Sequence, residues 1–333
     1  MSSFTGLCTT ALGVEYGSVS SRYFIIICQN VPIRGELLGY VFLAVIKKGT
    51  WPTPMKEHLQ KLIRGLGLDR LMEPVMNAAE PGIHIVKEPL RIATIGMSRL
   101  GGLPDVPANF VWPRCDQRPL TLLAQVNCEE VAPFDFAQTL PSSGVLYFFY
   151  DVEEQPWGFD PKDRAGSTVI YHTEAELRPA PRPTDLGSAL CLPSIPVSFK
   201  STLTIPTYGS AAYDSLCIDE DEEQDAYAEL CEAIDFGFDH RLLGHSNNIQ
   251  GDMQLECQLV SNGVYAGCVS DDYDRQVKLL GPGAADWCLL LQFGSDDDMG
   301  TMWGDCGTVY FWIRRQMLRE RDFTKTWTIL QCS

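Results

Sequence analysis

The hydrophobic pattern first becomes regular in residues 53–77. Thr53-Pro54 is typical of a helix start, because a threonine side chain can cap free amides and proline fits the first turn. Apolar side chains then recur at helical spacing, at Met55, Leu59, Leu62, Ile63 and Leu66. Two glycines interrupt the pattern before it resumes, so we expect two short helices that end near Asn77.

From residue 120 onward the apolar runs become short and typical of β-strands. In two places a strand that ends in glutamine and an apolar residue precedes a glycine, an aromatic strand and a closing strand. These runs lie within residues 120–126, 144–151 and 165–172, and within residues 286–293, 307–314 and 325–332. The repetition predicts an internal duplication, with two similar β-rich units that meet at a pseudo-twofold axis.

The segment between the two sets has a different composition. Prolines recur through residues 179–210, which predicts a long surface excursion rather than a central strand. An acidic run follows, in which Ala226, Leu230 and Ile234 recur at a spacing of four residues. That spacing predicts an amphipathic helix with a negative outer face.

Together these patterns predict an α+β fold, with N-terminal helices and an acidic helical insert packed on the two β-rich units. Residues 1–52 hold strand-like apolar runs, which predict either a hairpin or an extension outside the main fold. The remaining chain is expected to form one domain, residues 53–333. Its expected parts are helices and lead-in strands at 53–96, a first β unit at 97–178, the insert at 179–240 and a second β unit at 241–333.

The net charge of the 333 residues is −17, which argues against nonspecific binding to nucleic acid or to anionic membranes, because the negative field of the protein repels them. Residues 1–120 hold 13 basic and 9 acidic side chains, whereas residues 121–333 hold 13 basic and 34 acidic ones. The acidic part would suit a basic protein partner, and it would equally serve solubility.

The longest apolar run, Leu37–Ile46, is shorter than the roughly 20 residues that a membrane helix needs. No basic start followed by an apolar stretch is found, so we expect a cytoplasmic protein. The 12 cysteines lie singly, without a C-x-x-C pair. We therefore expect reduced thiols, no zinc site and no cofactor.

The stretch SRLGGLPDVPANFVWP, residues 98–113, holds the first candidate site. It lacks a phosphate-loop pattern, and Pro104 removes an amide that a phosphate cradle would use. The sequence predicts a turn that needs the dihedral freedom of Gly101 and Gly102, followed by a stiff belt across the sheet. Arg99, beside this turn, is a candidate to present its guanidinium to a carboxylate or phosphate.

Two other loops carry charge. In GSDDDMGTMWGD, residues 294–305, Asp296 and Asp298 are weak candidates for calcium or magnesium ligands, although the closing glutamate of a calcium loop is missing. The same acids are ordinary turn formers. The loop 155–164 surrounds a tryptophan with charges, which favours protein recognition. Its candidate residues are Trp157, Asp160, Asp163 and Arg164.

Four loops are expected to meet at the pseudo-twofold axis and to form a cleft. They are residues 99–104, 155–164, 250–252 and 296–305. In this hypothesis Trp157 and Trp303 anchor a basic peptide, and an arginine of that peptide pairs with an acid of the last loop. The remaining candidate binding residues are Gln250, Asp252, Asp297, Asp298 and Asp305.

Several phrases of the chain together resemble the YwqG-like family, a bacterial domain of unknown function, over residues 55–333. They include SRLGGLPDVP, PLTLLAQVN, GVLYFFYD, QPWGFDPKDR and LLLQFGSDDDMGTMWGDCGTVYFWI. The resemblance implies an α+β fold with two related β units, and it brings no catalytic residues. More distantly the chain is similar to the TYPP group, which includes the programmed-cell-death-2 and Tsr4 proteins. This similarity implies an escort or chaperone role, and the occurrence of family members near toxin systems implies an immunity role.

We therefore predict a non-enzymatic protein-binding module with a basic protein as partner. Neither a nucleophile elbow nor a zinc-protease pattern is found in the sequence. Two alternatives stay open. One is a nucleic-acid-processing or metal-dependent activity near Asp296–Asp305, and the other is a small-ligand sensor that uses the cleft between the β units.

Overall fold

The computed structural model describes residues 51–173, 176–219, 221–235, 239–268 and 273–333. Contacts divide the chain into two compact units, Met1–Pro52 and Thr53–Ser333. The hairpin and extension predicted for residues 1–52 fall almost wholly outside the described residues.

Two helices open the second unit, as predicted. Helix α1, Thr53–Gly65, buries Leu59 and Ile63, and helix α2, Met72–Ala78, buries Val75. A single 3₁₀ turn at Asp69–Leu71 joins them. The glycine-interrupted pattern therefore marks a real break between two helices.

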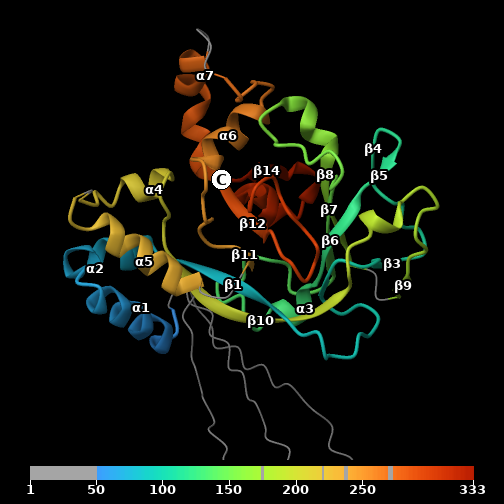
Figure 1. Ribbon diagram of the computed structural model, residues 1–333, viewed down its shortest axis with the longest axis horizontal. Coiled ribbons are helices and arrows are strands. Elements are labelled where there is room, and N and C mark those ends of the chain that lie inside the picture. Colours follow the sequence, from blue (N-terminus) through green and yellow to red (C-terminus); the bar gives the residue numbers. More distant parts are fainter. Residues whose placement is uncertain (1–50, 174–175, 220, 236–238, 269–272) are drawn as a thin grey trace, which may run out of the picture. The chain divides into compact units, whose positions relative to one another are not determined.

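Ten strands form one antiparallel sheet (Figure 1). Along the sheet the order is β14-β13-β12-β11-β1-β10-β2-β6-β7-β8. The strands are β1 Glu80–Lys87, β2 Arg99–Leu100, β6 Thr121–Asn127, β7 Val145–Tyr150, β8 Ser167–His172, β10 Ile195–Thr204, β11 His240–Leu242, β12 Trp287–Gly294, β13 Thr308–Arg314 and β14 Trp327–Gln331.

The sheet is nearly closed, because its two edge strands, β8 and β14, lie near one another (Figure 1). The loop between β7 and β8 runs along β14, where the Leu330 amide donates to the Trp157 carbonyl at 3.0 Å. The Trp327 indole donates to the Gly158 carbonyl at 2.8 Å. A Cβ at residue 158 would stand 2.0 Å from the Thr328 carbonyl oxygen, so only glycine fits there.

The two ends of the sheet have the same local pattern. Strands β6, β7 and β8 pair in order, and so do β12, β13 and β14, which confirms the six strands predicted from the sequence. Each set contains a register shift at the same place, between Leu122 and Ala124 in β6 and between Leu289 and Leu291 in β12.

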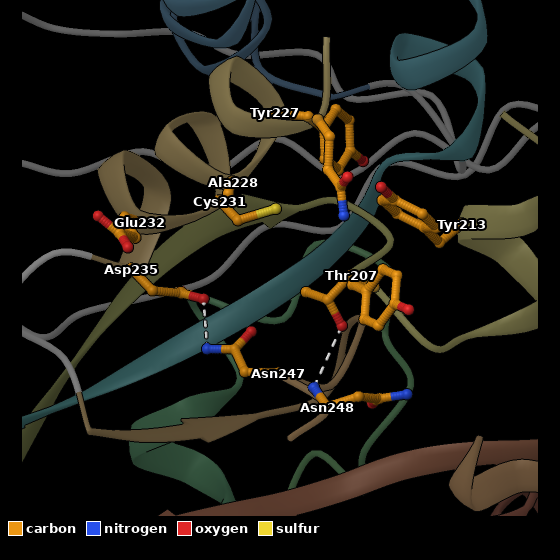
Figure 2. Close-up of a pocket in the computed structure, with 11 residues that line it drawn as sticks. Thr207, Tyr213, Tyr227, Ala228, Cys231, Glu232, Asp235, Asn247 and Asn248 are labelled. Carbon is orange, nitrogen blue, oxygen red and sulfur yellow. Dashed lines mark hydrogen bonds between the residues drawn. The ribbon is translucent and has the colours of Figure 1, made fainter. Parts of the chain in front are cut away.

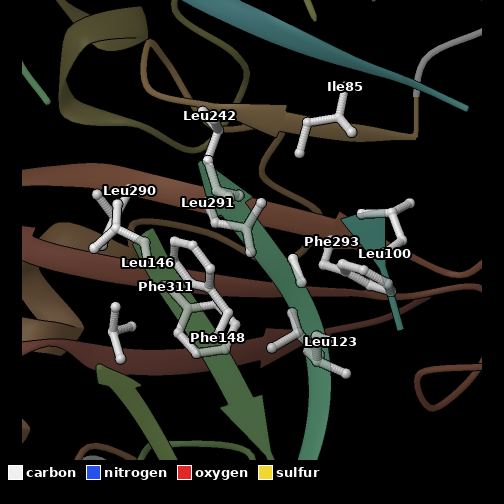
Figure 3. Close-up of a cluster of buried hydrophobic side chains, with 14 of the residues drawn as sticks. Ile85, Leu100, Leu123, Leu146, Phe148, Leu242, Leu290, Leu291, Phe293 and Phe311 are labelled. Atoms are coloured by element: carbon white, nitrogen blue, oxygen red, sulfur yellow. The ribbon is translucent and has the colours of Figure 1, made fainter. Parts of the chain in front are cut away.

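Side chains from both ends of the sheet meet in one hydrophobic core (Figure 3). Phe148 of β7 and Phe311 of β13 make an edge-to-face contact, with ring centroids 5.3 Å apart. Such a contact adds to the stabilisation that both rings gain by burial. The core is therefore shared between the two ends, rather than split into two separate cores.

Different elements cover the opposite faces of the two ends. On β6 and β7, Phe110 and Trp112 pack against Phe149, which confirms the predicted belt across the sheet. On β12 to β14 the cover is helix α6, Met253–Val260, which buries Met253 and Cys257 against the strands.

Strand β10 corrects the prediction of a surface excursion over residues 179–210. It pairs with β1 along eight positions and lies in the middle of the sheet. Pro196 is tolerated because it lies at the start of the strand, opposite Arg99, and the rest of the strand, Val197–Thr204, contains no proline.

Shorter elements connect these parts. The predicted acidic helix is α5, Gln224–Asp235, which buries Tyr227 and Leu230.

No helix among the described residues is both long and apolar enough to cross a membrane. The remaining elements are α3 Cys128–Val131, α4 Ala211–Asp214, α7 Tyr273–Leu280, α8 Arg315–Glu320, β3 Asp105–Val106, β4 Arg114–Cys115, β5 Arg118–Pro119, β9 Arg178–Pro179 and 3₁₀ turns at Pro161–Gly166, Ser188–Leu190, Gly281–Asp286 and Phe323–Lys325.

Candidate ligand-binding site

The glycine turn after β2 has the predicted conformation. Gly101 and Gly102 have φ of +59° and +71°, in the region that favours glycine. A Cβ on Gly101 would stand 2.1 Å from the Pro193 carbonyl oxygen. Pro104 is buried, and its carbonyl accepts a hydrogen bond from the Ala180 amide at 2.8 Å. This turn therefore joins parts of the fold.

Arg99 lies inside the protein rather than on a ligand-facing surface, which corrects its predicted role. Its guanidinium donates to Asp105 at 2.7 Å and to the Gln125 side chain at 3.2 Å. Burial alone would raise the pKa of Asp105, but the bonds from Arg99 and the Gly96 amide hold that pKa below its ordinary value. The guanidinium is thus neutralised internally.

Three of the predicted cleft loops do meet. The 99–104 turn lies against the 296–305 loop, since a Cβ on Gly101 would stand 2.8 Å from Met299 Cε. The 155–164 loop contacts the same loop through Gln155. The Gln155 side chain donates to the Met302 carbonyl at 3.2 Å and accepts from the Gly304 amide at 3.1 Å. Trp157 is 38% exposed, as a binding residue would need to be.

The charged residues of the 155–164 loop hold the loop itself. Asp160 caps the following turn through the Lys162 amide, and Asp163 accepts from the Gly158 amide at 2.8 Å. Arg164 donates to the Thr324 carbonyl and lies over the Trp327 ring.

Trp303 is buried, which corrects its predicted role as a surface anchor. The side chain is 1% exposed and packs against Tyr150 and Phe293. Its indole donates to the Gly294 carbonyl at 3.0 Å. An isolated bridge between Asp296 and Thr301 folds the loop back, which places the tryptophan in the core.

The acidic residues of this loop have separate environments. Asp296 is buried, with Lys87 Nζ at 2.7 Å and His240 Nε2 at 2.9 Å. Burial alone would raise the pKa of Asp296, but these bonds hold it well below its ordinary range. Asp298 is exposed and also pairs with Lys87, at 2.7 Å. Asp297 and Asp305 are exposed.

These contacts leave little support for a metal site. Asp296 already pairs with Lys87 and bonds to His240, and no group of three metal-type ligands occurs among the described residues. In the third predicted loop, the Gln250 amide donates to the Gln331 side chain at 3.1 Å. Asp252 caps α6 through the Gln254 and Leu255 amides.

A large cavity opens elsewhere, beside helix α5 (Figure 2). Its volume is about 710 Å³, within the range of small-ligand sites. We call it the tyrosine pocket. It is lined by Thr207, Tyr208, Tyr213, Gln224, Tyr227, Ala228, Cys231, Glu232, Asp235, Asn247 and Asn248.

Three tyrosines form one wall of the tyrosine pocket. The Tyr208 and Tyr213 rings are 5.6 Å apart, and the Tyr213 and Tyr227 rings are 5.4 Å apart, both edge-to-face. Tyr208 is 69% exposed at the surface, whereas Tyr227 is 1% exposed and donates to the Pro206 carbonyl at 2.8 Å. The wall therefore runs from the surface into the core.

Polar groups at the base of the pocket bind one another. The Asn247 side chain donates to Asp235 Oδ2 at 2.8 Å, and the Asn248 amide donates to Thr207 Oγ1 at 3.1 Å (Figure 2). Asp235 also accepts from Arg241, which is buried. Burial alone would raise the pKa of Asp235, but the Arg241 charge and a bond to His84 hold it well below its ordinary range. The base is thus rigid and ionised.

Arg241 follows the same local pattern as Arg99. Each arginine stands in β2 or β11 and contacts a glutamine of the neighbouring strand, Gln125 at 3.2 Å or Gln292 at 3.3 Å. Each also donates to the carbonyl four residues later, that of Leu103 or His245.

The residue six positions after each arginine is equivalent as well. In the first end this is Asp105, whose amide donates to the Gln125 side chain and whose carbonyl accepts from Tyr147. In the second end Asn247 makes both contacts, with the Gln292 side chain and with Tyr310. Because Asn247 has no carboxylate, Arg241 is neutralised by Asp235 of α5 instead.

The surface around the tyrosine pocket is acidic. Residues 201–240 contain 11 acidic side chains and no lysine or arginine. Within the pocket lining itself, Glu232 and Asp235 are charged negatively, and the lining contains no lysine or arginine. The site therefore favours a cationic ligand.

Sequence reasoning placed binding at the pseudo-twofold axis and missed this pocket. Two signals could have located it: the 40 residues without a basic side chain, and the three tyrosines within residues 208–227. Neither signal shows that the tyrosines share one wall, because that depends on how α5 packs against the 206–214 segment.

Comparison with protein families gives a match to a domain of unknown function, DUF1963, over residues 98–332. Comparison with curated proteins gives no match. The matched residues include nine of the ten strands of the sheet and the whole lining of the tyrosine pocket. The resemblance to the YwqG-like family is consistent with this match. Since the match covers well over half of the sequence, the chain belongs to the DUF1963 family.

Proposed function

We propose that the protein is a non-enzymatic binding module for a basic polypeptide, and that the acidic surface around the tyrosine pocket is its binding face. The observation that carries this proposal is the concentration of unneutralised carboxylates there. Such a field attracts cationic partners and raises their association rate.

The carboxylates of this face are mostly exposed and unpaired. Glu223 pairs with Arg70, and Asp235 pairs with Arg241. Eight further acids of residues 201–240 are exposed and form no ion pair within the described residues: Asp214, Asp219, Asp221, Glu222, Asp225, Glu229, Glu232 and Asp239. These carboxylates repel one another, and a bound basic partner would relieve that repulsion. A surface that served only solubility would need no such partner.

A small-ligand sensor is the second candidate, and the tyrosine pocket favours it. A cavity of about 710 Å³ with aromatic walls and a few fixed polar groups has the usual form of a small-molecule site. This site differs from the cleft between β units in which the sensor was first expected. The metal-dependent alternative has less support, because Asp296 already pairs with Lys87 and bonds to His240.

The similarity to the TYPP group supports an escort role among the possible protein-binding roles. Escort of a basic protein needs a surface that masks positive charge, and the 201–240 segment supplies one. An immunity role would use the same surface against a basic toxin.

We also infer that the two ends of the sheet arose by internal duplication. The matched strand order, the matched register shifts and the two arginine networks support this inference. Under duplication, Asp105 and Asn247 descend from one position, and the second copy has exchanged its own acid for one from the insert.

The test measures binding to a 20-residue peptide of alternating arginine and glycine, at low and at physiological salt. We expect a variant with Asp221→Asn, Glu222→Gln and Asp225→Asn to bind about 10-fold more weakly, with a smaller salt dependence. The control removes the same charge elsewhere, with Glu129→Gln, Glu153→Gln and Asp305→Asn, which are all exposed. Absence of binding at low salt, or equal weakening by the control, would contradict the proposal.

A further inference from the structure

We propose that the tyrosine pocket receives a single arginine side chain of the basic partner. This inference rests on the proposed function and names the group that the pocket selects. Three features carry it: the tyrosine wall, the excess of negative charge, and the saturated polar base.

The exposed end of the tyrosine wall offers an aromatic surface to a cation. Tyr208 is 69% exposed, and the three rings meet edge-to-face and are not stacked in parallel. Figure 2 shows Tyr213 across the pocket from Glu232 and Asp235. A cation in the pocket would contact an aromatic ring and lie in the negative field of Glu232.

One of the two carboxylates of the pocket lining is available to a ligand. Asp235 is neutralised by Arg241, so its pairing is internal. Glu232 is exposed and has no ion pair within the described residues, so its carboxylate can accept a guanidinium in bidentate fashion.

The saturated base favours arginine over lysine. The side chains of Asn247 and Thr207 are already bound to neighbours, as is the Asn248 side chain, which donates to the Gly251 carbonyl. An entering ammonium, which is strongly hydrated, would lose water and find few free acceptors there. A guanidinium is weakly hydrated and has flat faces that stack on aromatic rings, so its entry costs less hydration free energy.

The experiment titrates the whole protein with three acetylated and amidated pentapeptides, Gly-Gly-X-Gly-Gly, in a calorimeter. X is arginine, lysine or citrulline, which has the shape of arginine without its charge. We expect the arginine peptide to bind about 10-fold more tightly than the citrulline peptide and about 3-fold more tightly than the lysine peptide.

Variants then locate the binding. Tyr208→Ala and Glu232→Gln should each weaken binding of the arginine peptide about 3- to 10-fold. Tyr208→Phe, which keeps the ring, should leave the affinity unchanged. Glu229→Gln is the matched control, because Glu229 is exposed on the same helix but is not part of the lining. Tyr208 and Glu232 are exposed, so these changes should leave the unfolding midpoint unchanged.

Equal affinity for arginine and citrulline, or equal weakening by Glu229→Gln and Glu232→Gln, would overturn the inference. If the 20-residue peptide still binds and is weakened by the acid variant alone, the pocket inference fails while the proposed function stands. If neither peptide binds, both fail.

Discussion

The two ends of the sheet hold similar arginine networks, but only the network around Arg241 borders the tyrosine pocket. Around Arg99, the acid comes from Asp105, six residues further along the same segment. Phe110 of the belt packs on Tyr147 beside this network, and short strands β3 and β9 pair at Asp105 itself. No part of this network borders the tyrosine pocket.

Around Arg241, the acid comes from a distant element. Asp235 belongs to α5, which docks onto the sheet through this ion pair, and both Asp235 and Asn247 line the tyrosine pocket. The contact between arginine and glutamine is present at both ends, so it serves the fold and not the candidate site. The candidate site lies at the end where the acid that pairs with the arginine comes from α5 and not from the same segment.

The largest expected effect comes from removing either acid. Asp105→Asn and Asp235→Asn should each lower the free energy of unfolding by about 3–5 kcal/mol at pH 7, because each leaves a buried guanidinium without its counter-ion. Only Asp235→Asn should also weaken binding of the arginine peptide, since Asp235 positions α5. Urea denaturation and calorimetry measure the two effects.

The pH dependence of the wild type checks the same ion pairs. Both carboxyl groups have folded pKa values below the ordinary 3.8. The contribution of these two carboxylates to the free energy of unfolding is therefore complete above about pH 4. It is lost as the pH falls toward their pKa values in the folded state. The stability difference between wild type and either variant should shrink at pH 3; a constant difference from pH 7 to pH 3 would contradict the assigned pairs.

A second prediction concerns the turn that follows each arginine. Gly101→Ala should lower the free energy of unfolding by about 2–4 kcal/mol, because its Cβ would collide with the Pro193 carbonyl at a positive φ. The equivalent position in the second end holds Leu243, with φ of +60°. Gly65→Ala is the control, since nothing lies near its Cβ. Similar stability of both variants would show that the turn is not tightly packed.

A third prediction concerns the cover of the second end, α6. Burial and the neighbouring Asp252 raise the pKa of Glu256 to about 7. Because the pKa is raised, the contribution of Glu256 to the free energy of unfolding is full below the ordinary pKa of 4.5. It is lost as the pH rises through about 7. Glu256→Gln should therefore stabilise the protein by about 1–3 kcal/mol at pH 8 and have little effect at pH 4. A variant equally stable to wild type at both pH values would contradict the assignment.

Much of the fold could be predicted from the sequence, because local patterns determined it. The periodicity at 53–77 predicted α1 and α2, and the repeated apolar runs predicted the six strands of the two ends. Strand β10 was missed because its prolines lie before and at its start, where their missing amides do no harm.

The candidate site could be predicted only in part. The acidic helix was expected, but the pocket depends on long-range packing between α5 and the 206–214 segment. Arg99 and Trp303 were expected on the surface because glycine, proline and aspartate surround them. Their burial follows from contacts across the fold, with Gln125 for Arg99 and with Tyr150 for Trp303.

The most direct test compares the two candidate faces at equal charge. One variant carries Asp225→Asn with Glu232→Gln beside the tyrosine pocket, and the other carries Asp297→Asn with Asp305→Asn in the loop first expected to bind; all four residues are exposed. The dissociation constant of the 20-residue arginine–glycine peptide is measured for both at physiological salt. Binding through the acidic face predicts about 10-fold weakening for the first variant and less than about 2-fold for the second. The reverse order, or equal weakening, would contradict it.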